Sequence, residues 1–185
     1  HGNTCYRWWR DITHINDFSI AVLQNNNVQL TWNRYADFTD GTEIAAGNYT
    51  LKATYGNIET QGFEAPYYEG AKEFSIKKNE STNISVICYL ANVKVTTEYT
   101  ELFKKYFTDY TVNIRPAGST DISFDKNETR AAYVKPGKIS IYLSGSKQQG
   151  NKVTFEAATI ENAKARQHYR LKFDVQAGGT ELDVS

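Results

Sequence analysis

The sequence predicts an all-β protein built from two tandem antiparallel β-sandwich domains. The first observation behind this prediction is the stretch at residues 82–98, where apolar side chains recur with a period of two, as in a β-strand. The stretch is much longer than the about 5–6 residues of an ordinary strand, so we interpret it as two strands placed end to end. Up to Leu90 both sides are apolar, which predicts a strand covered on both faces. From Ala91 onward one side is polar, and we place a domain boundary near Ala91.

A second observation is a pattern that occurs twice. Residues 45–51 (AAGNYTL) resemble residues 135–141 (KPGKISI), and a hairpin precedes and a closing strand follows each copy. Two copies are too few for a solenoid, so we expect two similar sandwiches in tandem. The predicted fold class is thus all-β: two tandem antiparallel β-sandwiches of transthyretin-like or Ig-like type, with one short helix in the second. The predicted divisions are an N-terminal segment at residues 1–16, a first sandwich at 17–90 and a second at 91–185.

Composition excludes several classes of partner. The 185 residues suffice for one ordinary domain or two small ones. The 21 Lys and Arg residues balance 21 Asp and Glu residues and are spread along the chain, so no basic footprint for nucleic acid is present. No apolar run approaches the about 18 residues of a membrane helix, and no signal peptide is recognisable. Because the sequence begins at His1 and contains no Met, we expect it to start inside a longer precursor.

The first half opens irregularly and then becomes a series of strands. Residues 1–16 do not alternate cleanly, which predicts an irregular segment or an edge strand. Residues 18–23 and 28–32 alternate on either side of an Asn-rich turn, and Asn tolerates the left-handed backbone of a hairpin turn. Residues 47–56 (GNYTLKATYG) form a strand with Tyr49 and Leu51 facing inward. A long loop at 57–70 comes next, and the remaining strands of this half are expected around Phe74 and Ile76 and at residues 84–90.

The second half repeats this order with one addition. After a strand at residues 91–98, Thr100 can cap a short amphipathic helix at residues 100–106. Its apolar side is predicted to carry Leu102, Phe103, Tyr106 and Phe107. Further strands are expected at residues 110–115, 122–124, 138–145, 153–155, 169–175 and 182–184. We interpret residues 156–167 as a loop.

No catalytic, cofactor or metal motif is present in the sequence. His1, His14 and His168 lie far apart and have no second ligand at metal-binding spacing. Residues 125–128 (DKNE) carry oxygen donors that could hold calcium, but they lack the glycine and the bidentate glutamate of an EF-hand loop. We interpret that loop as a solvated turn. The sequence therefore predicts no catalytic residues, no metal, no cofactor and no enzymatic activity.

The two cysteines leave one structural choice open. Cys88 alternates with apolar neighbours in the predicted strand at residues 84–90, which favours a buried free thiol. A disulfide between Cys5 and Cys88 is the competing interpretation.

The loop at residues 63–68 (FEAPYY) is the best candidate for ligand recognition. Phe63, Tyr67 and Tyr68 surround a proline and could form a stiff, partly apolar platform for a sugar or a protein. Alternatively, the rings fold back over the end of the first sandwich and anchor the loop. We favour the anchoring role.

Six stretches of the sequence together resemble a known family. They are residues 46–56 (AGNYTLKATYG), 63–70 (FEAPYYEG) with Glu73 and Phe74, 85–98 (SVICYLANVKVTTE), 103–110 (FKKYFTDY), 126–134 (KNETRAAYV) with Pro136 and Gly137, and 168–175 (HYRLKFDV). In this order they resemble the fimbrillin-like surface lipoproteins of Bacteroidetes, which carry a domain of unknown function. The first 16 residues depart from the family pattern.

The resemblance implies export, a lipid anchor on a cysteine upstream of this sequence, and display on the extracellular side of the bacterial outer membrane. Related fimbrillins consist of tandem sandwiches and assemble by exchanging strands, and the family has no established enzyme activity. We therefore expect a non-catalytic cell-surface protein that acts in adhesion or fimbria-like assembly. The alternative is a carbohydrate-binding accessory module of a surface glycan-acquisition system. The expected partners are other surface proteins or host and dietary glycans, and not nucleic acid.

Overall fold

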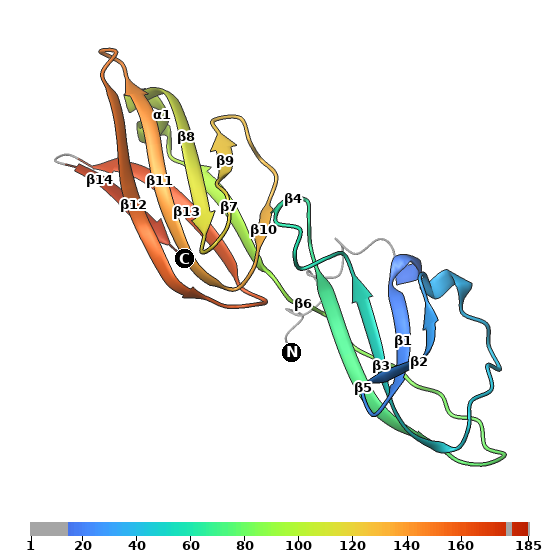
Figure 1. The fold of residues 1–185 in the computed structure, drawn as a ribbon. Helices are drawn as coiled ribbons and strands as arrows, with labels where there is room; N and C mark the ends of the chain where they lie inside the picture. Colours follow the sequence, from blue (N-terminus) through green and yellow to red (C-terminus); the bar gives the residue numbers. More distant parts are fainter. Residues whose placement is uncertain (1–14, 177–178, 185) are drawn as a thin grey trace, which may run out of the picture. The chain divides into compact units, whose positions relative to one another are not determined.

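The structure is a computed structural model that describes residues 15–176 and 179–184 (Figure 1). The predicted N-terminal segment lies outside the described residues except for Ile15 and Asn16. Backbone contacts divide the chain into two compact units. The first unit runs to Tyr55 and resumes at Tyr68–Tyr89; the second contains Gly56–Tyr67 and Leu90–Ser185. That these units are independent sandwich domains stays a prediction.

The first unit is organised around one five-stranded sheet. A hairpin joins β1 (Ser19–Gln24) to β2 (Asn27–Trp32), and the Asn residues of its turn adopt positive φ, as their type predicts. Next to β1 lies β3 (Gly47–Tyr55), followed by β5 (Tyr68–Ile76), and all of these neighbours are antiparallel. The strand order is β2-β1-β3-β5-β6, where β6 is Tyr89–Leu90. The first unit was predicted to be a sandwich of two sheets, but its described residues form only this one sheet.

The core of the first unit uses the side of β3 that the sequence predicts. Tyr49 and Ala53 are buried together with Phe18 and Val22, whereas Leu51 is half-buried. The Tyr49 hydroxyl donates a hydrogen bond to the carbonyl oxygen of Ala45 at 2.9 Å, so its polar end is satisfied. Since this core is small and aromatic, it depends on a few large side chains.

The predicted strand at residues 84–90 is largely wrong, because only β6 at its end has strand geometry. Ile84, Val86 and Cys88 are half-buried on one side, as their alternation suggests, but Ile87 on the other side is 60% exposed. This segment passes close to β5: a Cβ atom placed on Gly70 would lie 2.3 Å from the carbonyl oxygen of Ile87. The alternation therefore reflects burial of one side of an extended segment, and not a strand covered on both faces.

One sheet of the second unit is built around β7 (Val93–Tyr99). On one side β7 pairs antiparallel with β10 (Ala132–Val134), which in turn pairs with β4 (Gly62–Phe63). On the other side β7 pairs with β13 (His168–Gln176) in parallel, and β13 pairs antiparallel with β14 (Gly179–Val184). The parallel pair corrects the prediction of purely antiparallel sheets. Parallel neighbours come from distant parts of the chain, and strand periodicity does not report their direction.

The other sheet of this unit has the order β12-β11-β8-β9. Its strands are β8 (Phe107–Pro116), β9 (Ile122–Asp125), β11 (Gly137–Lys147) and β12 (Lys152–Ala163). Both sheets contribute to one buried apolar cluster, which contains Val93, Val95, Phe103, Phe107, Val112, Ile114, Phe124, Ile139, Ile141, Leu143, Leu171 and Phe173, among others.

Strand β12 occupies much of the segment that the sequence analysis interpreted as a loop. Its pairing with β11 shifts register at two places, between the partners of Ile141 and Tyr142 and again between those of Gly137 and Ile139. At each shift β12 contains an extra residue, so its side chains leave strict alternation. The bulges thus removed the period-two signal from a strand that is continuous in space.

The helix α1 (Glu101–Tyr106) begins where it was predicted. Thr100 is its N-cap, and the hydroxyl of Thr100 accepts a hydrogen bond from the backbone N–H of Phe103 at 3.2 Å. Phe103 and Phe107, four positions apart, are buried in the core, but Leu102 and Tyr106 are exposed. Since successive residues turn by about 100° around a helix, only one of the two (i, i+4) pairs faces the core.

Candidate binding surfaces

Phe63, the first of the predicted ligand-binding residues, packs inside the second unit. Its backbone pairs with Ala132 where β4 joins the sheet. Its ring meets the buried ring of Phe124 edge-on, with centroids 5.0 Å apart. The guanidinium of Arg130 covers the Phe63 ring, with the Arg130 carbon 4.8 Å from the ring centroid. Phe63 therefore anchors its loop, because an aromatic ring and a cation already contact it.

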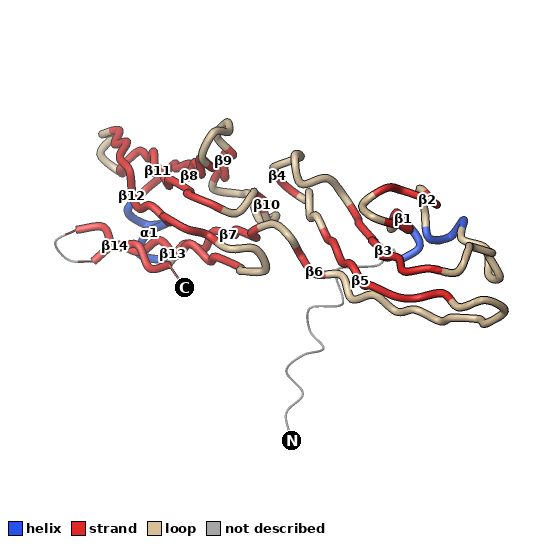
Figure 2. The backbone as a smooth tube through the Cα atoms, turned by 60° about the horizontal axis from the view of Figure 1, so that its bottom comes forward, coloured by secondary structure: helices blue, strands red, loops and turns tan. Residues whose placement is uncertain are grey.

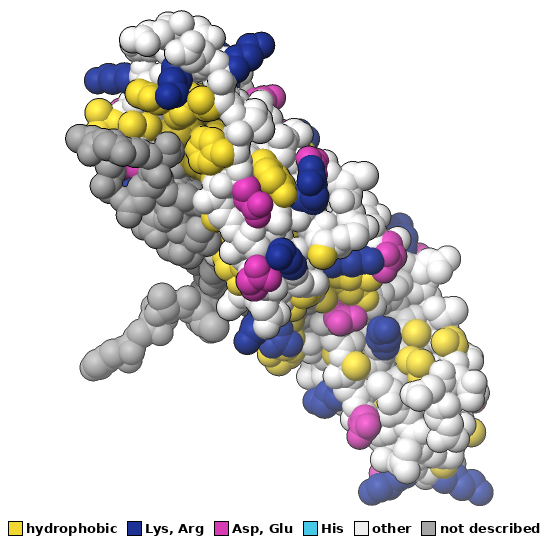
Figure 3. Space-filling view, turned by 60° about the vertical axis from the view of Figure 1, so that its left-hand side comes forward, with side chains coloured by type: hydrophobic (Ala, Val, Ile, Leu, Met, Phe, Trp, Pro, Cys, Tyr) yellow, Lys and Arg dark blue, Asp and Glu magenta, His cyan; other side chains and the backbone are white. Residues whose placement is uncertain are grey.

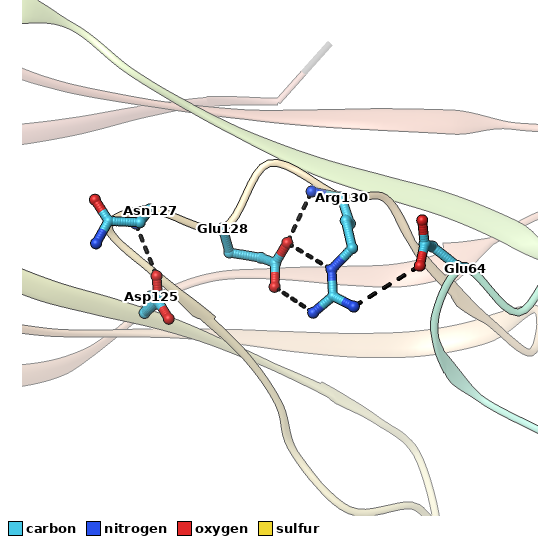
Figure 4. A network of polar contacts seen from close by, with 5 residues as sticks. All are labelled: Glu64, Asp125, Asn127, Glu128 and Arg130. Atoms are coloured by element: carbon cyan, nitrogen blue, oxygen red, sulfur yellow. Dashed lines mark hydrogen bonds and ion pairs between the residues drawn. The ribbon is translucent and has the colours of Figure 1, made fainter.

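Arg130 belongs to a polar network at the same edge (Figure 4). Its Nε and Nη2 donate to the two carboxylate oxygens of Glu128 at 3.0 and 2.8 Å, and its Nη1 lies 3.8 Å from Glu64. Hydrogen bonds from Arg130 lower the pKa of Glu128 to about 2. In the same turn, Asp125 accepts a hydrogen bond from the backbone N–H of Asn127 at 2.7 Å. In the loop at residues 125–128, the carboxylates of Asp125 and Glu128 thus already accept hydrogen bonds, from Asn127 and Arg130 respectively.

The backbone of Tyr67 is fixed by Asn92, the buried polar side chain of this unit, which is 1% exposed. The Asn92 Oδ1 accepts from the Tyr67 N–H at 3.2 Å, and the Asn92 Nδ2 donates to the Ala65 carbonyl oxygen at 3.1 Å. The Tyr67 carbonyl oxygen also accepts from the Ala91 N–H at 2.7 Å. One amide side chain therefore holds both ends of the segment around Pro66.

Tyr68 starts β5 and belongs to the first unit, where its ring centroid lies 6.5 Å from that of Phe18. Tyr67 and Tyr68 are both half-buried. Phe63 and Tyr67 thus belong to the second unit and Tyr68 to the first. A ligand platform made of these three rings stays a prediction, and so does anchoring over the first sandwich, since Phe63 packs against the core of the second unit.

The other titratable candidates are placed separately. The ring of His168 lies 2.8 Å from the Thr96 hydroxyl, and burial, with smaller contributions from Lys94 and Arg170, lowers the pKa of His168 to about 4. The thiol of Cys88 is half-buried and lies 3.8 Å from the Ala53 carbonyl oxygen; burial raises the pKa of Cys88. His1, His14 and Cys5 lie outside the described residues. Cys88 is a free cysteine, as the favoured interpretation predicted, although it is half-buried and not fully buried. Among the described residues, no three His, Cys, Asp or Glu side chains gather as a metal site would require.

A cluster of three aromatic rings in the first unit was missed by the sequence analysis. Trp32 ends β2, and the 3₁₀ turn η3 (Tyr35–Asp37), drawn as a short helix in Figure 2, follows directly. Trp32 and Phe38 meet edge-on with ring centroids 5.1 Å apart, and Tyr35 and Phe38 are nearly parallel, at 15°, with centroids 6.2 Å apart. Tyr35 is 42% exposed and Phe38 37%. We call Trp32, Tyr35 and Phe38 the aromatic cluster.

Local hydrogen bonds position the aromatic cluster. The Tyr35 N–H donates to the Phe18 carbonyl oxygen at 2.6 Å, which ties the turn to the start of β1. The Phe38 N–H donates to the Tyr35 carbonyl oxygen at 3.0 Å and closes the 3₁₀ turn. Arg34, which precedes Tyr35 in the chain, forms an ion pair through its Nη2 with Asp17 Oδ1 at 3.1 Å. The sequence signal was present: in WNRYADF three aromatic residues stand three positions apart within a polar stretch.

The described residues contain no membrane-spanning helix, and the face drawn in Figure 3 carries charges of both signs. Within the described ranges, no helix has the length and hydropathy of a membrane span. Figure 3 shows basic and acidic side chains interspersed over the face drawn, in agreement with the equal numbers of the two in the sequence.

Comparison with known families identifies the chain. A family model described as "Domain of unknown function (DUF4493)" matches residues 9–185. The chain belongs to the DUF4493 family. A search of the curated proteins found no match for this DUF4493 chain.

Three solved structures from Bacteroides are similar to this DUF4493 chain. A proposed cell adhesion protein from Bacteroides uniformis matches with TM-score 0.60 and 12% identity, over 93% of this chain and 91% of that one. Proposed polysaccharide-binding proteins (DUF1812) from Bacteroides thetaiotaomicron match with TM-score 0.53 and 9% identity, over 94% and 89%. A second proposed cell adhesion protein from Bacteroides thetaiotaomicron matches with TM-score 0.50 and 15% identity, over 96% and 88%. At these identities the similarity shows a shared fold.

Proposed function

We propose that this chain is a non-catalytic cell-surface protein that acts in adhesion or fimbria-like assembly. The observation that carries the proposal is the segment at residues 81–88, which lies beside β5 outside regular strand geometry and exposes Ile87. An extended, partly apolar segment at a sheet edge is a place where another chain can add a strand. The fold that the chain shares with the Bacteroides uniformis protein supports the proposal, since that protein is named for cell adhesion.

The proposal extends to location. As the resemblance to fimbrillin-like lipoproteins implies, the chain is displayed on the extracellular side of the outer membrane through a lipid anchor upstream of His1. Antibody labelling of intact cells that express the full precursor tests this location. Labelling only after the cells are permeabilised would contradict it.

Assembly is tested by replacing Ile87 with Lys. A charge on an exposed edge opposes pairing with a second chain, so we expect Ile87→Lys to weaken self-association at least tenfold in sedimentation velocity. Leu102→Lys is the matched control, because Leu102 is equally exposed but lies on α1. A wild-type chain that stays monomeric at all concentrations, or an Ile87→Lys variant that associates like the control, would contradict assembly through this edge.

The second candidate function is carbohydrate binding, as an accessory module of a surface glycan-acquisition system. It is favoured by the solvent-exposed aromatic cluster and by the name of the Bacteroides thetaiotaomicron proteins that share the fold. Binding of the purified chain to a glycan array tests it.

A further inference from the structure

We propose that the aromatic cluster, together with Arg34 and Asp17, forms a binding site for a neutral saccharide. The proposal rests on the second candidate function and gives it a location that differs from the loop containing Phe63, Tyr67 and Tyr68. All the residues of this site lie between Asp17 and Phe38, within the first unit. The site therefore does not depend on how the two units are placed.

The orientation of the rings suits a pyranose. Tyr35 and Phe38 stack with ring centroids 6.2 Å apart and planes within 15° of parallel, so Tyr35 turns one face toward Phe38 and the opposite face away from it. The face of an aromatic ring carries partial negative charge and attracts the partially positive C–H groups on the flat side of a sugar ring. Trp32, edge-on to Phe38, supports the Phe38 ring from the strand.

The polar groups beside the rings suit hydroxyl groups. The Arg34 side chain is 56% exposed, and its Nε and Nη2 both donate to the same oxygen of Asp17, at 3.3 and 3.1 Å. Arg34 directly precedes Tyr35 in the chain, so the pair supplies donors and acceptors next to the turn, and small-ligand sites use such groups to set orientation and specificity. The Tyr35 hydroxyl, on an exposed ring, adds a group that can donate or accept.

The charge of the site favours a neutral ligand. Arg34 is already paired with Asp17, and Asp37 lies within the turn itself. Arg34, Asp17 and Asp37 together carry one positive and two negative charges. An acidic sugar would meet an excess of negative charge and would compete with Asp17 for Arg34. Neutral hexoses and pentoses pay no such electrostatic cost.

The size of the exposed apolar surface favours a sugar over a protein. A large aromatic side chain has about 150–250 Å² of surface, so two rings that are about two-fifths exposed offer roughly 120–200 Å². A stable protein interface covers about 800 Å² on each partner. The cluster is thus several times too small for a protein interface and matches one or two sugar rings.

The test is a glycan array of neutral glucans, galactans, mannans and xylans, with polygalacturonate and hyaluronan as acidic probes. We expect the wild-type chain to bind at least one neutral glycan. Tyr35→Ala should weaken this binding at least tenfold. Tyr35→Leu should do the same, since it keeps an apolar contact with Phe38 but lacks the aromatic face, and it guards against a loss that comes from unfolding. Tyr35→Phe should stay within about threefold. Tyr106→Ala, an exposed tyrosine on α1, is the matched control.

Each outcome decides between the site and the function. Loss of neutral-glycan binding in Tyr35→Ala and Tyr35→Leu, with melting temperatures near wild type and the control unaffected, supports the proposal. Unchanged binding in both variants overturns the site but leaves carbohydrate binding standing. Binding to acidic glycans alone overturns the neutral class. A wild-type chain that binds no glycan overturns both the site and the second candidate function.

Discussion

Replacing Asn92 tests whether one buried amide holds the segment around Pro66. The Asn92 side chain bonds the Tyr67 N–H at 3.2 Å and the Ala65 carbonyl at 3.1 Å. In Asn92→Ala both backbone groups lose this partner. A buried polar group without a partner costs about 1–3 kcal/mol. Because Ala65 and Tyr67 are half-buried and partly reached by water, we expect the free energy of unfolding to fall by about 2–4 kcal/mol.

Asn92→Asp separates the two hydrogen bonds by their chemistry. An ionised carboxylate still accepts from the Tyr67 N–H but meets the Ala65 carbonyl oxygen with a second acceptor. The protonated acid can donate to that carbonyl, so folding favours the protonated form and raises the pKa of the introduced carboxyl. A raised folded pKa gives stability that is fully present below the unfolded value of about 3.9 and is lost as pH rises through the folded pKa. The stability gap between Asn92→Asp and wild type should therefore shrink as pH falls.

The assay combines a global and a local measurement. Urea unfolding followed by circular dichroism gives the free energy of each variant, and hydrogen exchange of the Tyr67 amide reports on the bond itself. Asn113→Ala is the matched control, since the Asn113 side chain accepts only from the exposed Ser123 hydroxyl and its loss should cost less than about 1 kcal/mol. The assigned role of Asn92 is refuted if Asn92→Ala has the same free energy of unfolding as Asn113→Ala and the Tyr67 amide exchanges at the wild-type rate.

Three further predictions concern the cores. Ile141→Ala removes a fully buried side chain and should lower the free energy of unfolding by about 2–5 kcal/mol. Leu51 is half-buried, so Leu51→Ala should lower it by about 1–2 kcal/mol. Equal losses in urea unfolding would contradict this ranking. Tyr99→Phe removes a buried hydroxyl that lies near the Thr97 hydroxyl but makes no hydrogen bond of good geometry among the described residues, so stability should stay equal or rise by up to about 1 kcal/mol. A clear loss of stability would show that the two hydroxyls are bonded. Burial is the main cause that lowers the pKa of His168 to about 4 in the folded chain. As pH falls, the unfolded chain therefore takes up a proton on this ring at a higher pH than the folded chain does. The free energy of unfolding should fall by about 1–2 kcal/mol between about pH 6.5 and about pH 4. His168→Gln should remove that part of the pH dependence, and an NMR titration of the ring with its pKa near 6.5 would exclude the effect.

Elements with an uninterrupted alternation were predictable from the sequence. Ile139, Ile141 and Leu143 alternate along β11, and all three are buried in the core of the second unit. Thr100 caps α1 because a hydroxyl at that position satisfies an N–H group that the helix cannot. These features depend on neighbours within a few residues, which the sequence displays directly.

Features that depend on distant partners were not predictable. Strand β13 lies parallel to β7, although the paired residues are more than seventy positions apart in the sequence. The contact between Thr96 and His168 is one example. The packing of Phe63 depends on Phe124 and Arg130, which belong to a different part of the chain. Strand β12 was hidden because two bulges break its alternation. In each case the missing information is which segment lies opposite.

The contrast between Phe63 and Tyr35 shows what separates an anchoring ring from a binding ring. Both lie in polar stretches beside a charged pair, so residue type and local charge do not distinguish them. Phe63 has its surface taken by Phe124 and by the Arg130 guanidinium, so a ligand would have to displace a cation–π contact and a buried ring. Tyr35 meets the protein mainly through Phe38 and remains 42% exposed. The difference follows from backbone geometry. Phe63 is in a strand paired to the sheet, which carries its ring toward the core. Tyr35 begins a 3₁₀ turn, and its ring stacks on Phe38, which follows that turn. Exposure and ring contacts, and not residue type, therefore distinguish Tyr35 from Phe63.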